Sequence, residues 1–258
     1  MSTSGGKTSA ELKAFARGTI LSCLPVCIGA NLIYSLVRFL LDNIVAGVLT
    51  DASVLSFVMN IALSFLSAVF MGIFQAGLCL IYLKLIFGQP ASVRDLFHCF
   101  RESPDRVVRL QAVISALQLA GLLPVQIYMS FFSRGSVLSL AELLSQDRTA
   151  LVGMAVRFGT LSLIGTVIQF AVSLFLGLSC YILLDFPELG TVEILQRSIR
   201  LMRGAKGKLL YITLSFIPLY LIGFISFGIA NLWVMAYEQA VLAAFYKDRL
   251  EAAGRTEV

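Results

Sequence analysis

Glu238 is the residue whose type and position in this chain most strongly suggest chemistry. It lies in an apolar run, roughly 13 Å along a helix from Lys247. A carboxylate at that depth in a membrane is costly, so it must face protein or water, or be protonated. The chemistry open to it is proton coupling, binding of a cationic group or pairing with an arginine. A polar clamp shared with Gln239 is the structural alternative.

Amide side chains recur in other apolar runs of the chain. They are Asn31, Asn60, Gln75, Gln111, Gln118, Gln126, Gln169 and Asn231. Amides on several helices could line a polar path, although they more often form interhelical hydrogen bonds of about 1 kcal/mol or less each. We therefore group Gln118 and Gln169 with Glu238 and Gln239 as a candidate intramembrane polar site.

Basic residues form a second candidate site. Arg197, Arg200 and Arg203 recur every three residues, and Lys206 and Lys208 follow closely. Contact with anionic phospholipid headgroups is the expected role, because each such charge near a membrane surface contributes about 1 kcal/mol. Docking of an acidic partner protein is the alternative.

Enzymatic chemistry has little support in the sequence. The chain has one histidine, His98, and it has neither an H-E-x-x-H motif nor a P-loop. Cys23 and Cys27 lie one helical turn apart, but without a third ligand they are better interpreted as buried apolar thiols. Asp185 and Glu188 match no metal-binding spacing. We therefore expect a protein that is not an enzyme and has no metal or other cofactor.

The composition requires lipid as the solvent for much of the chain. Of the 258 residues, 58% are hydrophobic and 14% are charged, and the mean hydropathy is +0.88. A soluble domain of this length cannot bury that much apolar surface. The formal net charge is +5, and the basic residues lie beside apolar runs. This placement favours anionic lipid over nucleic acid as the partner.

Long apolar runs predict six membrane-spanning helices. They cover residues 18–41, 53–87, 107–131, 151–184, 208–227 and 229–246. Sixteen of the twenty Lys and Arg residues lie on one side of this topology. Their segments are 7–17, 84–109, 197–208 and 247–255. Basic flanks resist translocation, so both termini are expected to be cytoplasmic. On the outer side, the apolar spacing in residues 132–150 predicts a short surface helix.

The chain therefore divides into three parts, and the fold class is an all-α, polytopic membrane helix bundle. Residues 1–17 form a cytoplasmic segment with a short amphipathic helix, which Thr8 and Glu11 begin as a capping box. Residues 18–246 form the membrane domain, and residues 247–258 form a cytoplasmic tail.

An internal repeat is predicted around two cytoplasmic connections. Ser92 to Arg101 reads S-V-R-D-L-F-H-C-F-R, and Thr191 to Arg200 reads T-V-E-I-L-Q-R-S-I-R. At a constant offset, Ser92 pairs with Thr191 as an N-cap hydroxyl. Both segments are expected to be amphipathic helices on the inner membrane surface. The preceding spans carry four-residue stripes, mostly of small residues, that would let helices approach closely. The stripes are Ser64, Ala68, Gly72 and Ala76, and Gly165, Gln169, Ser173 and Gly177.

Three segments carry a resemblance to a known family. They read G-L-C-L-I-Y-L-K-L-I-F-G-Q-P-A-S-V-R-D-L-F, D-F-P-E-L-G-T-V-E-I-L-Q-R-S-I-R-L-M-R-G-A-K-G-K-L-L and L-W-V-M-A-Y-E-Q-A-V-L-A-A-F-Y-K-D. The chain resembles the DUF975 family of bacterial integral membrane proteins over most of its length. The family often has proline where this chain has Ala236, so the last span is expected to be straighter. The resemblance implies a bacterial plasma membrane protein and no particular activity.

Two functional hypotheses follow from these observations. The first is a non-enzymatic membrane protein that assists transport or envelope function through contacts with lipids, a partner membrane protein or a second copy of itself. The alternative is a small carrier or channel that uses a polar path between the repeats, with Glu238 as the coupling group.

Overall fold

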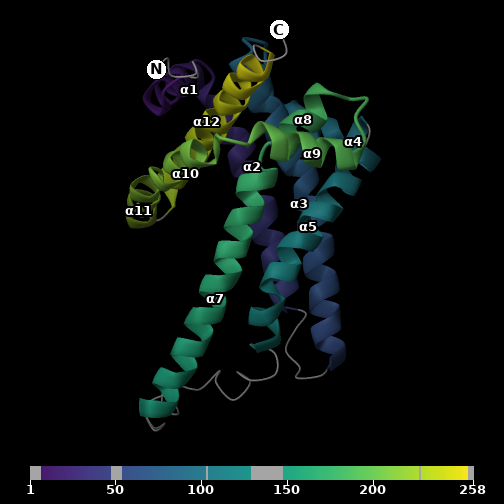
Figure 1. The fold of residues 1–258 in the computed structure, drawn as a ribbon, viewed down its shortest axis with the longest axis vertical. Helices are drawn as coiled ribbons and strands as arrows, with labels where there is room; N and C mark the ends of the chain where they lie inside the picture. Colours follow the sequence, from purple (N-terminus) through teal and green to yellow (C-terminus); the bar gives the residue numbers. More distant parts are fainter. Residues whose placement is uncertain (1–6, 48–53, 103, 129–147, 227, 255–258) are drawn as a thin grey trace.

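The computed structural model describes residues 7–47, 54–102, 104–128, 148–226 and 228–254, and these residues contain helices and no strand. The elements are α1 (Ser9–Ser22), α2 (Leu24–Gly47), α3 (Val54–Ile86), the 3-10 helix η1 (Val93–Phe97), α4 (His98–Arg101), α5 (Pro104–Ile127), α7 (Arg148–Leu176), α8 (Ser179–Asp185), α9 (Thr191–Leu201), α10 (Lys206–Leu214), α11 (Ile217–Ile225) and α12 (Ile229–Gly254). Figure 1 shows α2, α3, α5 and α7 running along the long axis, with the shorter helices and both termini gathered at one end. The predicted outer helix in 132–150 lies almost wholly outside the described residues.

Five stretches of the described chain are long and apolar enough to cross a membrane, which is compatible with an integral membrane protein. They are Leu24–Gly47, Val54–Ile86, Pro104–Ile127, Ala155–Asp185 and Lys206–Ile225. The predicted sixth span, 229–246, is helical within α12 but is not among them. Its polar residues Asn231, Glu238 and Gln239 lower its hydropathy. Six spans are therefore not confirmed.

The first predicted span is divided into two helices. The capping box is confirmed, because the Thr8 hydroxyl accepts from the Glu11 N–H at 3.3 Å and Glu11 Oε2 accepts from the Thr8 N–H at 2.7 Å. The helix that begins there continues to Ser22, and α2 begins after a break at Cys23. Pro25 lies in the first turn of α2, where a missing N–H costs no helical hydrogen bond.

Two further predicted spans are also divided. Residues 151–184 contain a break at Gly177 and Leu178, between α7 and α8. Residues 208–227 contain a break at Ser215 and Phe216, between α10 and α11, and Pro218 follows in the first turn of α11.

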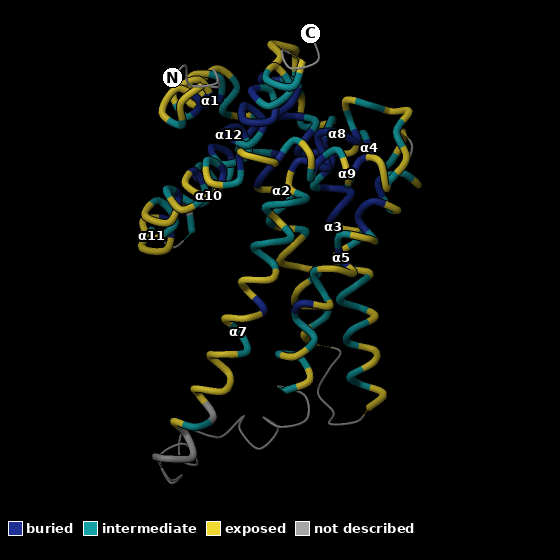
Figure 2. The backbone as a smooth tube through the Cα atoms, viewed as in Figure 1, coloured by how far each residue is buried: buried dark blue, intermediate teal, exposed yellow. Residues whose placement is uncertain are grey.

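The buried core lies at the end of the molecule that carries both termini. Figure 2 shows buried backbone gathered there, whereas the opposite half of α7 is largely exposed. The largest fully buried side chains include Tyr82, Tyr181, Tyr246, Phe216 and Phe245. Apolar residues far from this core face outward, which is the arrangement expected where lipid is the solvent.

Helix α5 packs between α3 and α7, and glycines set the distances. A Cβ on Gly72 of α3 would overlap the side chain of Gln111 on α5. A Cβ on Gly165 of α7 would lie 3.2 Å from Leu122 of α5. Both glycines belong to the predicted stripes, so these parts of the stripes pack against α5 of the same chain.

The two connections that were predicted to be cytoplasmic share a helix start, in a register one residue away from the predicted one. Ser92 N–H donates to Asp95 Oδ2 at 2.9 Å, and Gly190 N–H donates to Glu193 Oε2 at 3.0 Å. The acid is thus the third helical residue in both copies. The prediction of Thr191 as an N-cap is wrong, because Thr191 is already the first helical residue and Gly190 precedes it.

Burial supports the corrected register. Leu96 and Ile194, which follow the two acids directly, are both fully buried. The backbones differ, because the first copy is the 3-10 helix η1 followed by one turn of α4, whereas the second is the continuous helix α9. A pair of equivalent amphipathic surface helices is therefore not confirmed.

Candidate functional site

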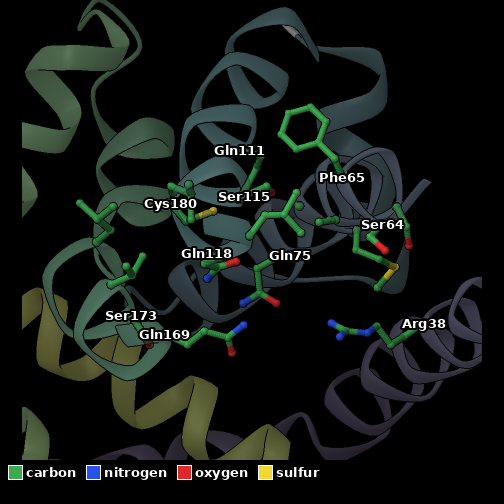
Figure 3. A pocket seen from close by; sticks show the side chains of 18 of the residues that line it. Arg38, Ser64, Phe65, Gln75, Gln111, Ser115, Gln118, Gln169, Ser173 and Cys180 are labelled. Carbon is green, nitrogen blue, oxygen red and sulfur yellow. The ribbon is translucent and has the colours of Figure 1, made fainter. Parts of the chain in front are cut away.

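A cavity of about 660 Å³ lies between α2, α3, α5, α7 and α12. It is lined by three of the four residues of the predicted polar site, Gln118, Gln169 and Gln239. Figure 3 shows the Gln118, Gln75 and Gln169 side chains converging on this space from α5, α3 and α7. The structure thus brings together amides that are far apart in the sequence.

Six glutamines line the cavity. They are Gln75 of α3, Gln111, Gln118 and Gln126 of α5, Gln169 of α7 and Gln239 of α12. The three on α5 are spaced by seven and eight residues, so they share one face of the helix. The face from Gln111 to Gln126 extends about 22 Å along the helix axis at 1.5 Å per residue. That length covers most of a hydrocarbon core of about 30 Å.

Several of these amides have unused hydrogen-bonding capacity. The Oε1 atoms of Gln126 and Gln239 are buried and have no hydrogen-bond partner among the described residues. Gln75 Nε2 makes a long contact of 3.9 Å with Cys79 Sγ on its own helix. A buried acceptor without a donor costs about 1–3 kcal/mol.

Arg38 of α2 supplies a charge at the cavity wall. Its Nε donates to Asp42 Oδ2 at 3.0 Å, as expected for a pair one helical turn apart. Figure 3 shows Arg38 reaching into the cavity toward Gln75 and Gln169. The sequence places Arg38 near the outer end of the first span, but α2 continues to Gly47. Arg38 is therefore well inside the helix.

Glu238 lies outside the cavity, away from the other three residues of the predicted site. Its Oε2 accepts a hydrogen bond from the Tyr220 hydroxyl of α11. Successive residues on a helix point about 100° apart, so Gln239 can line the cavity while Glu238 faces α11. The predicted site is therefore divided: Gln118, Gln169 and Gln239 line the cavity, and Glu238 faces α11.

Thiols and carboxylates are placed away from metal-binding geometry. Cys79 and Cys180 line the cavity and are buried, free thiols. Across the described ranges, no three His, Cys, Asp or Glu side chains are close enough together to hold a metal ion. Asp185 accepts a hydrogen bond from the Tyr246 hydroxyl at 2.9 Å, so this carboxylate is fixed by the core.

The turn after Asp185 is held by hydrogen bonds to its backbone. Arg106 of α5 donates to the carbonyl oxygens of Phe186 and Leu189, at 3.4 and 3.0 Å. These bonds connect α5 to the segment that precedes α9. The D-F-P-E-L-G segment therefore has a structural role in connecting α5 to the segment before α9.

The basic residues of the second candidate site have unequal surroundings. Arg200 and Arg203 are exposed. The Arg197 guanidinium lies 4.0 Å from the ring centroid of Phe186, and the Lys206 ammonium lies 3.9 Å from a phenylalanine ring of α7. These cation–π contacts leave Arg200 and Arg203 as the members most available to another molecule.

Lys208 is committed to a cluster at the chain termini. Its Nζ forms a 2.9 Å salt bridge with Asp248 Oδ2 and a hydrogen bond with the Lys7 carbonyl. The Lys7 N–H also donates to Asp248 Oδ1 at 2.8 Å. Burial raises the pKa of the Asp248 carboxyl, but these hydrogen bonds and the charges of Lys208 and Arg249 outweigh burial, so its pKa lies below the ordinary value.

Comparisons with known proteins give one match. A family model described as "Protein of unknown function (DUF975)" matches residues 1–253. Neither the curated proteins nor the solved structures contain a match to the chain.

Proposed function

The chain belongs to the DUF975 family, whose function is unknown, and we propose that it is a small membrane carrier that binds a polar group in its amide-lined cavity. The observation that carries this proposal is the convergence of six glutamines from four helices on one space. In a membrane, polar side chains without partners are destabilising, so a row of them needs a compensating polar occupant.

The chemistry of the lining favours binding over catalysis. An amide offers two donors and one acceptor group, and it does not exchange protons near neutral pH. Such side chains recognise hydroxyl, amide and phosphate oxygens by hydrogen bonding. A ligand with several such groups could exchange partners along the roughly 22 Å face of α5, which is what passage through a membrane requires.

This proposal departs from the carrier hypothesis drawn from the sequence in one respect. Glu238 was expected to couple transport to a proton, but it lies outside the cavity and accepts a hydrogen bond from Tyr220 of α11. Gln118, Gln169 and Gln239 line the cavity, so we assign them the binding role and leave Glu238 to the contact between α11 and α12.

Native mass spectrometry in nanodiscs tests the proposal. The protein is extracted with its lipids, and bound molecules are identified for wild type and for the double variant Gln118→Leu, Gln169→Leu. We expect a bound component, enriched over its abundance in the membrane, that the double variant loses. Gln196→Leu is the matched control, because Gln196 is exposed on α9 and outside the cavity. Equal retention by wild type and the double variant would refute the proposal.

A second candidate function is docking of lipid or an acidic partner on the cytoplasmic face of the plasma membrane. It is favoured by the exposure of Arg200 and Arg203. Replacing both with glutamate should reduce co-purification of anionic lipid or of a stoichiometric partner protein. Unchanged co-purification would remove this candidate. Lys208 is not suited to this test, because its loss would break the pair with Asp248.

A further inference from the structure

Arg38 provides information about the charge of the ligand. It lies 14 residues after Leu24 and 9 before Gly47, or about 21 and 14 Å along α2. An arginine this far inside a membrane-spanning helix is costly unless it meets polar or charged groups. Among the described residues that line the cavity, Arg38 is the one cation, and it is directed into the space that the amides surround.

The pair with Asp42 orients Arg38 without occupying all of its donors. Asp42 accepts from Nε and the Tyr34 side chain also hydrogen-bonds the guanidinium, so the other N–H groups of its two terminal nitrogens remain for another acceptor. Those two nitrogens form a planar fork that matches two oxygens of one phosphate or carboxylate group. A guanidinium held by a neighbouring carboxylate loses less side-chain entropy when it binds a ligand.

Neighbouring side chains complete a site for a ligand that carries several oxygen atoms. Gln75 and Gln169 lie on the side of the cavity toward which Arg38 reaches, and each offers an amide N–H₂ donor. Ser64 and Ser115 also line the cavity and offer hydroxyls. The combination of one guanidinium fork with several uncharged donors suits an anionic phosphate bonded to a hydroxyl-bearing group.

Exposed apolar residues on two helices that wall the cavity indicate how such a ligand would be accommodated. Leu36 and Phe39 of α2 are exposed, as is Ile164 of α7. These residues present lipid-compatible surface on two of the helices that wall the cavity. Acyl chains could therefore remain in the bilayer while a headgroup occupies the polar space.

We propose that Arg38 selects a ligand with a phosphate group linked to hydroxyl groups, either a phospholipid headgroup or a water-soluble phosphate ester. This proposal rests on the proposed function, because it assigns a substrate class to the same cavity. The glutamines bind the uncharged part of the ligand, and Arg38 discriminates for the phosphate.

The experiment compares two lipids whose headgroups both carry hydroxyls. Nanodiscs contain equal parts of phosphatidylglycerol and digalactosyldiacylglycerol, and native mass spectrometry measures which lipid the protein retains. We expect wild type to prefer phosphatidylglycerol and Arg38→Gln to reduce that preference by about tenfold, as loss of a charge-assisted hydrogen bond implies. Arg157→Gln is the control, because Arg157 is an exposed arginine of α7 outside the cavity.

A second arm distinguishes the two sources of phosphate. Nanodiscs made only of digalactosyldiacylglycerol receive glycerol 1-phosphate, and its binding is measured for wild type and Arg38→Gln. Binding that depends on Arg38 identifies a water-soluble phosphate ester. Absence of binding here, with a phosphatidylglycerol preference in the first arm, identifies a lipid headgroup. Either result supports selection of phosphate.

Several outcomes would overturn the inference. One is a wild type with neither a preference for phosphatidylglycerol nor binding of glycerol 1-phosphate, and another is an equal effect of Arg157→Gln. If lipid retention still depended on Gln118 and Gln169, the proposed function would stand and only the role of Arg38 would fail. Should Arg38→Gln not fold, Arg38→Lys replaces it, since lysine keeps the charge but lacks the fork, and an unchanged preference would count against the inference.

Discussion

Single glycines determine how closely backbones approach at the end of the bundle that carries the termini. Gly77 of α3 lies against η1, where a Cβ would overlap the carbonyl oxygen of Leu96. That oxygen belongs to the backbone of a fully buried residue, so it cannot move aside as the end of a flexible side chain could. The close approach of α3 and η1 therefore depends on the absence of a side chain at this position.

Gly77→Ala should destabilise the protein by about 1–3 kcal/mol, the usual cost of overpacking a core. Gly159→Ala is the matched control, because Gly159 is a helical residue of α7 with nothing within 4 Å of an added Cβ. The control should be neutral or stabilising by about 0.5–1 kcal/mol, since alanine favours a helix over glycine. Thermal unfolding in detergent measures both variants, and equal stability of Gly77→Ala and wild type would contradict the contact.

The carboxyl of Asp248 predicts a pH dependence of stability. Its pKa is lower in the folded protein than its ordinary value, which is about 3.9. A lowered carboxyl pKa contributes stability that is fully present above the ordinary value and is lost as pH falls toward the folded value. Wild type should therefore lose stability below about pH 4 through this group.

Asp248→Asn isolates this contribution. The melting temperature of the variant should lie below that of wild type by a constant amount above about pH 5, and the difference should narrow below about pH 4. Melting curves across this range, recorded in one detergent, make the comparison. A difference that stays constant down to the acid end would show that Asp248 does not contribute through its charge.

The sequence identifies the six glutamines of the cavity but not their arrangement. Gln118, Gln169 and Gln239 could be recognised because amides in apolar runs are unusual. Glu238 was grouped with them for the same reason, yet one residue along a helix changes the direction of a side chain by about 100°. Arg38 lies three residues before the predicted end of the first span, residue 41, whereas α2 continues to Gly47. Which face meets which neighbour depends on tertiary packing.

At the scale of elements, α11 and α12 form a closely packed pair. A Cβ on Gly223 of α11 would overlap the Asn231 side chain of α12. About one turn earlier on α11, the Tyr220 hydroxyl donates to Glu238, which lies about two turns after Asn231 on α12. The pair thus holds its polar side chains against each other. Glu238 belongs to this contact, which lies apart from the amide-lined cavity.

Glu238→Gln should leave occupancy of the cavity unchanged, because glutamine can still accept the hydrogen bond from Tyr220. Glu238→Leu removes that acceptor and should destabilise the protein by about 1–3 kcal/mol, since the Tyr220 hydroxyl loses its partner. Native mass spectrometry reports the occupancy and thermal unfolding reports the stability. Loss of the bound component in a folded Glu238→Gln protein would show that Glu238 takes part in binding.

The existence of the long helices follows from the sequence more readily than their breaks. Apolar runs longer than about 20 residues predict spans, and α2, α3, α5 and α7 lie where four of them were expected. The breaks at Gly177 and Ser215 were not predicted, whereas the break at Cys23 lies two residues before Pro25, the proline that interrupts the first predicted span. Hydropathy averages over a window and does not report where a helix changes direction, and Pro25 and Pro218 mark such points only to within a few residues.

At the scale of the whole molecule, the meeting of the termini constrains the topology. The Lys7 N–H donates to Asp248 at 2.8 Å, and α1 lies beside α12 at one end of the molecule in Figure 1. An odd number of crossings would separate these residues by a membrane. If α2, α3, α5 and α7 make four crossings, the segment from α10 to α12 must enter and leave the membrane on the same side.

Both termini should therefore be accessible from one face of the membrane, and the basic flanks predict the cytoplasmic face. Protease protection of short tags at each terminus, in inverted and right-side-out vesicles, measures this. Cleavage of both tags in inverted vesicles alone is the expected result. Cleavage of one tag in each kind of vesicle would contradict the contact between Lys7 and Asp248.

The central claim is that the amide-lined cavity holds a specific polar ligand, and site-directed photocrosslinking in the membrane tests it most directly. A photoreactive amino acid is placed at Gln118, which lines the cavity, or at the adjacent Leu117, which is 47% exposed. The position at 118 should capture one enriched component, whereas the position at 117 should capture bulk lipids in proportion to their abundance. Capture of the same lipid mixture at both positions would contradict the account.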